Sequence, residues 1–248
     1  MPIKKKDFIE LEYTGRLKEE NIVFDTTDEK TAKDSEIHNP KATYGPVVIC
    51  VGENHILKGL DAALEGKEIG KHKIELTAEH AFGKKDAKLI QMIPLNKFNQ
   101  HEIRPFPGLQ INIDGVMGTV KTVSGGRVLV DFNHPLSGKD VIYEVKINKI
   151  LTDRKEQVNA LMKLLLGIKD AEIKIERETA KITLKTELPK QISEEMIKKI
   201  TELTGIKTVE FSKEEKKQEK KTEEKTEEKK ETKTEKPKAE KPKQEQKA

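Results

Sequence analysis

The side chains that would line a pocket fall in two blocks of the sequence, which residues 84–131 separate. The first block carries Tyr13, Phe24, Asp25, Val47, Ile56, Leu57, Leu60 and Phe82, and the second carries Leu136 and Tyr143. Nearly all of these side chains are apolar or aromatic, and Asp25 is the one carboxylate. An apolar, water-poor pocket suits a reaction that needs no nucleophile or metal and whose bound group becomes less polar at the transition state.

Each of these aromatic residues, taken alone, is most often an ordinary core residue of a β domain. The short motifs around them are more specific than the single residues. They are Phe24-Asp25, the run Gly-x-x-x-Ile-Leu-x-Gly-Leu at 52–60, Ala-Phe-Gly at 81–83 and Asn-His-Pro-Leu-Ser-Gly-Lys at 133–139. Packing alone does not explain their occurrence in this order, so we interpret the two blocks as one domain that an insertion interrupts.

In these motifs the chain resembles the FKBP family of peptidyl-prolyl isomerases, in the SlyD-like long form with an insert-in-flap chaperone domain and, as in archaeal members, an extra C-terminal domain. The resemblance covers residues 1–151. It implies catalytic roles for Tyr13 and Asp25. It also implies substrate-binding roles for Phe24, Val47, Ile56, Leu57, Leu60, Phe82, Leu136 and Tyr143, and it requires no cofactor. Isomerisation is slow because twisting the amide crosses a barrier of about 18–20 kcal/mol.

Two positions depart from the better-known members of that family. Phe82 stands where many members have a tyrosine hydroxyl, and Leu60 stands where many have tryptophan. These differences favour a rival hypothesis, a non-catalytic holdase chaperone on a degenerate scaffold, whereas the intact Tyr13 and Tyr143 favour the isomerase. The role of Asp25 is open between an electrostatic effect on the rotating carbonyl group and orientation of Tyr13.

The hydrophobic pattern predicts an α+β fold for the interrupted domain, residues 1–83 and 132–151. Alternating residues predict strands at 7–13, 44–51, 73–76 and 141–150, and apolar residues at helical spacing predict a short helix between residues 54 and 66. We expect a twisted antiparallel sheet wrapped on that helix, with Tyr13 pointing inward.

Residues 84–131 predict a small inserted β domain, because Asp114-Gly115, Gly118 and Ser124-Gly125-Gly126 are hairpin turn signals. It has more large apolar side chains than a module of this size readily buries in a core. This indicates an exposed chaperone surface for unfolded segments. The candidate residues are Met92, Ile93, Leu95, Phe98, Ile103, Phe106 and Leu109. The alternative is that they fill the module's own core.

Residues 152–212 predict a C-terminal αββαβ domain. A capping box at Asp153 and a glycine at position 167 bound its first helix, and we expect Ser193 to cap the second. No catalytic constellation occurs in it, so a third hypothesis makes it a docking module for a ribosome, a chaperonin or a second copy of the chain; its partner is unknown.

Residues 213–248 hold 14 Lys and 11 Glu and no aliphatic side chain larger than alanine, which indicates a disordered, solvated tail.

The amino-acid composition indicates which kinds of partner to expect. The formal net charge is +4, most of it from the tail, where both signs alternate without aromatic residues, which argues against nucleic-acid binding. The chain has one cysteine, Cys50, and no apolar run of membrane-spanning length, so we expect a cytoplasmic protein without membrane contact. The six histidines lack metal-ligand spacing, so no metal is expected. The expected partners are unfolded or nascent polypeptides with X-Pro bonds.

Overall fold

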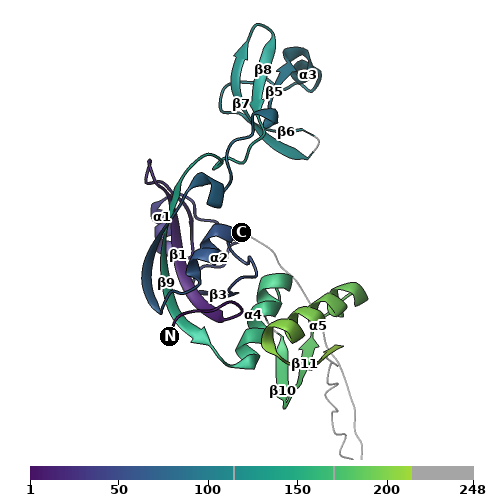
Figure 1. The fold of residues 1–248 in the computed structure, drawn as a ribbon. Coiled ribbons are helices and arrows are strands. Elements are labelled where there is room, and N and C mark those ends of the chain that lie inside the picture. Colours follow the sequence, from purple (N-terminus) through teal and green to yellow (C-terminus); the bar gives the residue numbers. More distant parts are fainter. Residues whose placement is uncertain (114, 170, 214–248) are drawn as a thin grey trace, which may run out of the picture. The chain divides into compact units, whose positions relative to one another are not determined.

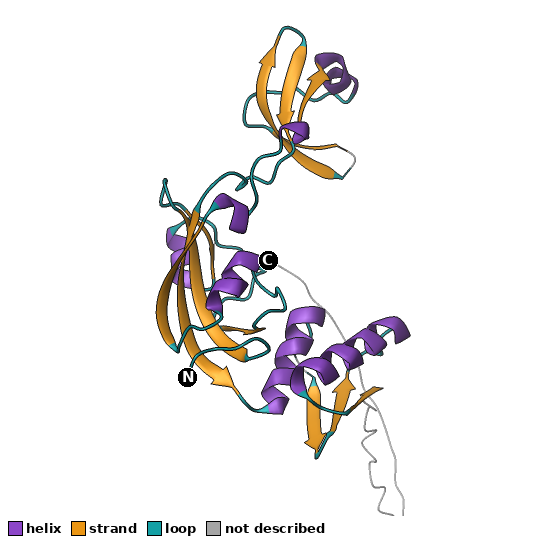
Figure 2. Cartoon of the chain, in the orientation of Figure 1, coloured by secondary structure: helices purple, strands orange, loops and turns teal. Residues whose placement is uncertain are grey.

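The computed structural model describes residues 1–113, 115–169 and 171–213 of the chain (Figure 1). Three sheets and a few short helices make up these residues, as Figure 2 shows, which confirms the predicted α+β class. The tail expected at 213–248 lies outside the described residues, except for Lys213. Within the described part of the chain, no helix combines the length and the apolar character needed to cross a membrane.

Both sequence blocks contribute strands to the first, five-stranded sheet. Its strands are β1 (Phe8–Leu17), β2 (Val23–Thr26), β3 (Val47–Cys50), β4 (Gly70–Leu76) and β9 (Val141–Leu151). The order is β2-β1-β9-β4, and β3 also pairs with β1. All of these pairings are antiparallel. Because side chains alternate between the faces of a strand, Ile9 and Leu11 turn to the core and Glu10 and Glu12 to the other face.

Two short helices accompany this sheet, where the sequence predicted one. Helix α1 (Glu29–Asp34) follows β2, and Asp28 caps it by accepting a hydrogen bond from the Thr31 N–H. Helix α2 (Lys58–Leu64), labelled in Figure 1, packs Leu60 and Leu64 into the core of the sheet. A 3-10 turn, η1 (Ala78–His80), lies against α2.

Helix α2 begins at residue 58 because the preceding residues form a turn. The buried carboxylate of Asp61 accepts hydrogen bonds from the backbone N–H of Gly52 at 3.0 Å and of Asn54 at 2.8 Å. These bonds provide acceptors for the backbone N–H groups of the turn, which has no regular hydrogen-bond ladder of its own.

The one cysteine, Cys50, lies at the end of β3, just before this turn. Burial raises the pKa of its thiol to about 12, so the thiol stays protonated in the core.

The inserted segment contains a four-stranded sheet and one helix. Its elements are η2 (Ala87–Leu89), β5 (Ile90–Pro94), α3 (Leu95–Gln100), β6 (Gln110–Ile113), β7 (Val116–Ser124) and β8 (Arg127–Asp131), with the strand order β5-β8-β7-β6. The predicted turn at Ser124-Gly125-Gly126 is confirmed, because both glycines have positive φ between β7 and β8. The turn predicted at Gly118 is wrong. Gly118 lies inside β7, where a Cβ atom would come within 2.7 Å of the Phe132 ring.

The apolar residues of the insert divide between its core and its surface. Phe98 is only 4% exposed and belongs to the module's core, so its assignment to the chaperone surface is wrong. Three of the predicted residues are half-buried against that core: Ile93, Leu95 and Leu109. Met92, Ile103 and Phe106 are exposed, and so are four residues that the predicted surface omitted: Leu89, Ile90, Val116 and Met117.

The C-terminal segment has the predicted αββαβ order. Its elements are α4 (Arg154–Leu166), β10 (Glu172–Glu176), β11 (Thr179–Leu184), α5 (Lys190–Thr204) and β12 (Thr208–Lys213). Asp153 caps α4 and Gly167 ends it in a left-handed conformation, as expected. Ser193 is not the cap of α5. That helix begins at Lys190 after Pro189, and the Ser193 hydroxyl donates instead to the Lys190 carbonyl.

Gly59 offers a test of how α2 is fixed on the turn at residues 78–80. A Cβ atom at Gly59 would meet the His80 carbonyl oxygen at 2.0 Å, and this neighbour is backbone. At a solvent-exposed helix position Gly→Ala stabilises the protein. At Gly59 the steric overlap of the new methyl group with the His80 carbonyl outweighs that gain. We therefore expect Gly59→Ala to lower the free energy of unfolding by about 1–3 kcal/mol. Chemical denaturation measures this. Ala62→Ser, at an exposed position of α2, is the control; equal stability of both variants would contradict the packing described.

Candidate active site

A tyrosine and a carboxylate meet where β1 and β2 pair. The Tyr13 hydroxyl donates a hydrogen bond to Asp25 Oδ2 at 3.0 Å. In the antiparallel register Gly15 lies opposite Asp25, and Gly15 and Tyr13 share a face of β1 because they are two residues apart. The two side chains that the sequence singled out for catalysis are therefore in direct contact.

Aromatic rings from distant parts of the chain surround this pair. The ring of Phe24 makes edge-to-face contacts with Tyr143, at a centroid distance of 5.7 Å, and with Phe82, at 5.6 Å. Tyr13 and Tyr143 are 5.8 Å apart in a similar geometry. Edge-to-face contacts of this kind favour one arrangement of the rings beyond their burial. The result is a cup with apolar walls and one charged group at its edge.

Gly15 makes room for these rings. A Cβ atom at this position would lie 2.8 Å from the Phe24 ring and 2.9 Å from the Tyr143 ring. Any larger residue would displace both rings from β1. Sequence analysis did not include Gly15 in the site, although a glycine inside an alternating strand is a recognised sign of close approach by other groups.

A cavity of about 270 Å³ adjoins Tyr13 and Asp25. Of the ten predicted pocket residues, four line it: Tyr13, Phe24, Asp25 and Val47. The other six belong to the core cluster that continues from these walls. Leu60 and Tyr143 are buried in this cluster, and Ile56, Leu57, Phe82 and Leu136 are partly buried against it. The structure thus places four of the ten residues at the cavity and the other six in the core cluster of the same sheet.

The rest of the cavity wall comes from the segment between β2 and β3, which sequence analysis did not identify. It supplies Thr27, Ala32, Ile37 and Tyr44, among others. Thr27 ties this segment to β1, because its N–H donates to the Tyr13 carbonyl at 2.9 Å and its Oγ1 accepts from the Tyr13 N–H at 2.9 Å. No motif marks this wall, since its residues meet the cavity only through the path of the loop.

The second sequence block closes the other side of the cup. The Ser137 hydroxyl donates to the Phe82 carbonyl at 3.0 Å, and the Gly138 N–H donates to the Gly83 carbonyl at 2.8 Å. The imidazole ring of His134 stacks on Phe82, with the centroids 4.8 Å apart and the rings nearly parallel. These contacts fix Phe82 in the wall although it lacks a hydroxyl group.

Burial controls the ionisation of the cup's two tyrosines. Desolvation, followed by the charge of Asp25, raises the pKa of Tyr13 far above its ordinary value, and the same two causes raise the pKa of Tyr143. Both hydroxyls therefore stay protonated at neutral pH. The one proton of the Tyr13 hydroxyl is donated to Asp25.

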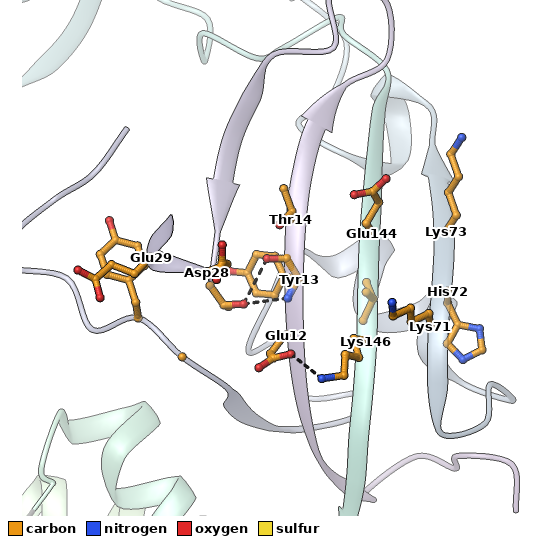
Figure 3. A pocket seen from close by; sticks show the side chains of 14 residues that line it. Glu12, Tyr13, Thr14, Asp28, Glu29, Lys71, His72, Lys73, Glu144 and Lys146 are labelled. Carbon is orange, nitrogen blue, oxygen red and sulfur yellow. Dashed lines mark hydrogen bonds and ion pairs between the residues drawn. The ribbon is translucent and has the colours of Figure 1, made fainter. Parts of the chain in front are cut away.

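A larger groove of about 870 Å³ lies over the solvent-facing side of the same sheet (Figure 3). Figure 3 shows charged side chains from β1, β9 and β4 around it, among them Glu12, Lys146 and Lys73. Acidic and basic side chains occur together in this groove. The described residues contain no group of three or more His, Cys, Asp or Glu side chains that would hold a metal ion.

Comparisons with known proteins identify the family to which the chain is similar. The family model described as FKBP-type peptidyl-prolyl cis-trans isomerase matches residues 1–104, and that described as FKBP26, IF domain, matches residues 91–136. The chain is 32% identical to a short-type peptidyl-prolyl cis-trans isomerase of Methanocaldococcus jannaschii over 60% of this chain and 94% of the relative.

Two bacterial relatives are similar over shorter stretches. An FKBP-type 16 kDa peptidyl-prolyl cis-trans isomerase of Escherichia coli is 30% identical over 50% of this chain and 83% of the relative. The isomerase SlyD of Helicobacter pylori is 27% identical over 46% of this chain and 63% of the relative.

Tyrosine titration tests the contact between Tyr13 and Asp25. The chain has three tyrosines and no tryptophan, so absorbance near 295 nm reports tyrosinate directly. Because the raised pKa values of Tyr13 and Tyr143 belong to the folded state, their contribution to stability is present below about pH 10 and is lost as the pH rises further. In Asp25→Asn we expect the pKa of Tyr13 to fall. Asp34→Asn, an exposed change in α1, is the control; identical titrations for both variants would contradict the contact.

Proposed function

The chain belongs to the FKBP-type peptidyl-prolyl cis-trans isomerase family, and we propose that the cup around Tyr13 and Asp25 is its isomerase site. The protein is a peptidyl-prolyl cis-trans isomerase. The observation that carries the assignment of the site is the hydrogen bond between Tyr13 and Asp25 beside a small cavity with aromatic walls. The aromatic rings of Tyr13, Phe24 and Tyr44 suit a proline ring.

The cup acts by favouring the twisted amide over the planar one. As the X-Pro bond rotates, resonance is lost and the charge separation between carbonyl oxygen and nitrogen decreases. A site that excludes water and offers apolar walls stabilises this less polar state relative to the ground state. No covalent intermediate forms, so the protein needs only to bind, desolvate and orient the bond.

Asp25 acts through orientation of Tyr13 in this proposal. The carboxylate holds the Tyr13 hydroxyl at 3.0 Å, and burial keeps that hydroxyl protonated. Phe82 and Leu60 replace polar or larger groups that many relatives carry. They change the shape of the cup and the hydrogen bonds it offers, while its apolar character remains.

The insert is the candidate chaperone module. Its exposed apolar residues, among them Met92, Ile103, Phe106, Val116 and Met117, are the proposed contacts for unfolded segments. Flexible methionines adapt to varied partners. A captured segment presents its prolines to the cup at raised effective concentration, without full dissociation between attempts. The proposed partners are therefore unfolded or nascent polypeptides, met in the cytoplasm.

The first test is isomerisation of a short X-Pro peptide, measured by exchange NMR with catalytic amounts of protein. We expect Asp25→Ala to lower kcat/KM about tenfold, because a hydrogen bond to a charged group is worth about 1.5–3 kcal/mol. The control, Asp34→Asn, retains full activity. A wild-type protein without any acceleration would instead support the holdase hypothesis.

The second test separates the insert from the cup. The chain leaves and re-enters the sheet domain through paired segments, where Asn133 Oδ1 accepts from the Asp86 N–H at 2.8 Å, so a short turn can replace residues 87–131. We expect this variant to isomerise peptides as the intact protein does and to lose acceleration of proline-limited refolding. Unchanged refolding catalysis would contradict the capture step.

A further inference from the structure

The cavity of the cup has a second tyrosine in its wall, which comes from the loop between α1 and β3. Tyr44 is half-buried and lines the cavity together with Tyr13 and Phe24. A phenol hydroxyl has one proton to donate and an oxygen that also accepts. The proton of Tyr13 is donated to Asp25, so this hydroxyl has none left for a bound peptide.

The Tyr44 hydroxyl acts as an acceptor and keeps its proton. The backbone N–H of Asn39 donates to the Tyr44 oxygen at 2.8 Å. Over the described ranges of the chain, no residue accepts the proton of that hydroxyl. A hydroxyl that accepts one hydrogen bond becomes a better donor, because successive hydrogen bonds polarise one another. Asn39 lines the cavity as well, so Tyr44 and the group that polarises it both belong to the cavity wall.

A tight turn sets the position of the Asn39 N–H group. The Ala42 N–H donates to the Asn39 carbonyl at 3.0 Å, which closes a four-residue turn with Pro40 at its second position. Proline favours this position because its ring fixes φ near the value that the turn requires. The Asn39 side chain supports the same turn by accepting from the Lys41 N–H at 3.0 Å. The donor to Tyr44 is therefore held by local structure.

The ring of Tyr44 is held from two further sides. The imidazole ring of His38 stacks on it, with the centroids 5.2 Å apart and an angle of 14° between the planes. The next residue, Gly45, donates its N–H to the Thr27 carbonyl at 2.8 Å. Thr27 in turn is hydrogen-bonded to the backbone of Tyr13. Tyr44 is thus linked through the backbone to the opposite wall of the cavity.

The other polar side chains of this wall are poorer donors to a bound peptide. Asn39 and Thr43 are exposed, so a hydrogen bond from either side chain gains little over a bond to water. Thr26 and Thr27 are buried, and both hydroxyls donate to a backbone carbonyl of β1. Tyr44 therefore combines partial burial with a proton that no described residue accepts.

We propose that Tyr44 is a substrate-binding residue, whose hydroxyl donates a hydrogen bond to a backbone carbonyl of the peptide next to the rotating X-Pro bond. This rests on the assignment of the cup as the isomerase site. A carbonyl beside the rotating bond keeps its charge during rotation, so the hydrogen bond stabilises the bound substrate and the transition state equally. Its loss raises KM and leaves kcat nearly unchanged.

The test measures kcat and KM separately, by exchange NMR of a short Ala-Pro peptide over a range of peptide concentrations. We expect Tyr44→Phe to raise KM about fivefold, the usual size for one neutral hydrogen bond, with kcat changed less than about twofold. A wild-type KM in this variant would overturn the proposal. The isomerase site itself would stand in that case, because the peptide would still be turned over.

A second variant separates donation to the substrate from the structural bond with Asn39. Tyr44→O-methyltyrosine, made by site-specific incorporation, keeps the oxygen that accepts from Asn39 and removes the proton. We expect the same increase in KM as for Tyr44→Phe. If the hydroxyl served only to accept from Asn39, this variant would keep the wild-type KM, and the proposal would fail.

A third variant excludes an effect of the added methyl group. A ring-fluorinated tyrosine at position 44 keeps the hydroxyl and makes it a stronger donor, so we expect KM to fall below the wild-type value. A KM at or above the wild-type value would overturn the proposal. The control is Thr208→Val, which removes an exposed hydroxyl from β12 and retains both kinetic constants. No acceleration by the wild-type protein would instead contradict the assignment of the cup.

Discussion

The long antiparallel pairing between β1 and β9 is the constraint on which the rest of this structure depends. It joins residues 8–17 to residues 141–151 along the whole length of β1. Because β9 also pairs with β4, it occupies the interior of the sheet, although it comes after the inserted segment in sequence. Tyr13 and Tyr143 meet only through this pairing. A loop's closure entropy grows slowly with its length, so a long insertion between the paired strands costs little provided its two ends stay together. The bond from Gly138 to Gly83 keeps them together.

The chemistry of the cup follows from packing as much as from reactive groups. Gly15 lets Phe24 and Tyr143 lie directly on β1, and Tyr143 packs against Tyr13, which is half-buried beside the exposed Asp25. Burial raises the pKa of Tyr13 and keeps its hydroxyl protonated. One cause, burial by aromatic rings, therefore provides both the apolar walls and the protonation state that the reaction uses.

The surface proposed for client polypeptides lies on the insert. The insert presents exposed apolar side chains such as Met92 and Phe106, and apolar contacts of this kind form with many sequences because they have no preferred direction. The solvent-facing side of the first sheet differs, because it carries charges of both signs in strand register, with Lys146 between Glu12 and Lys71.

Sequence determined the family of this protein and four of the five strands of its first sheet, all but β2, because alternating hydrophobicity and the motifs around Phe24-Asp25 and 133–139 are local properties. It also marked the αL end of α4 at Gly167, where a residue without a side chain is favoured. It placed Gly118 in a turn, because a glycine is equally compatible with a turn and with close packing against another side chain. It placed Phe98 on the surface, because a phenylalanine in a small module occurs both in the core and on a binding surface. Only the tertiary structure brought Thr27 and Tyr44 to the cavity and left Lys71 opposite Lys146. These relations depend on a loop path and a strand register between residues far apart in the chain, and no local pattern encodes either of them.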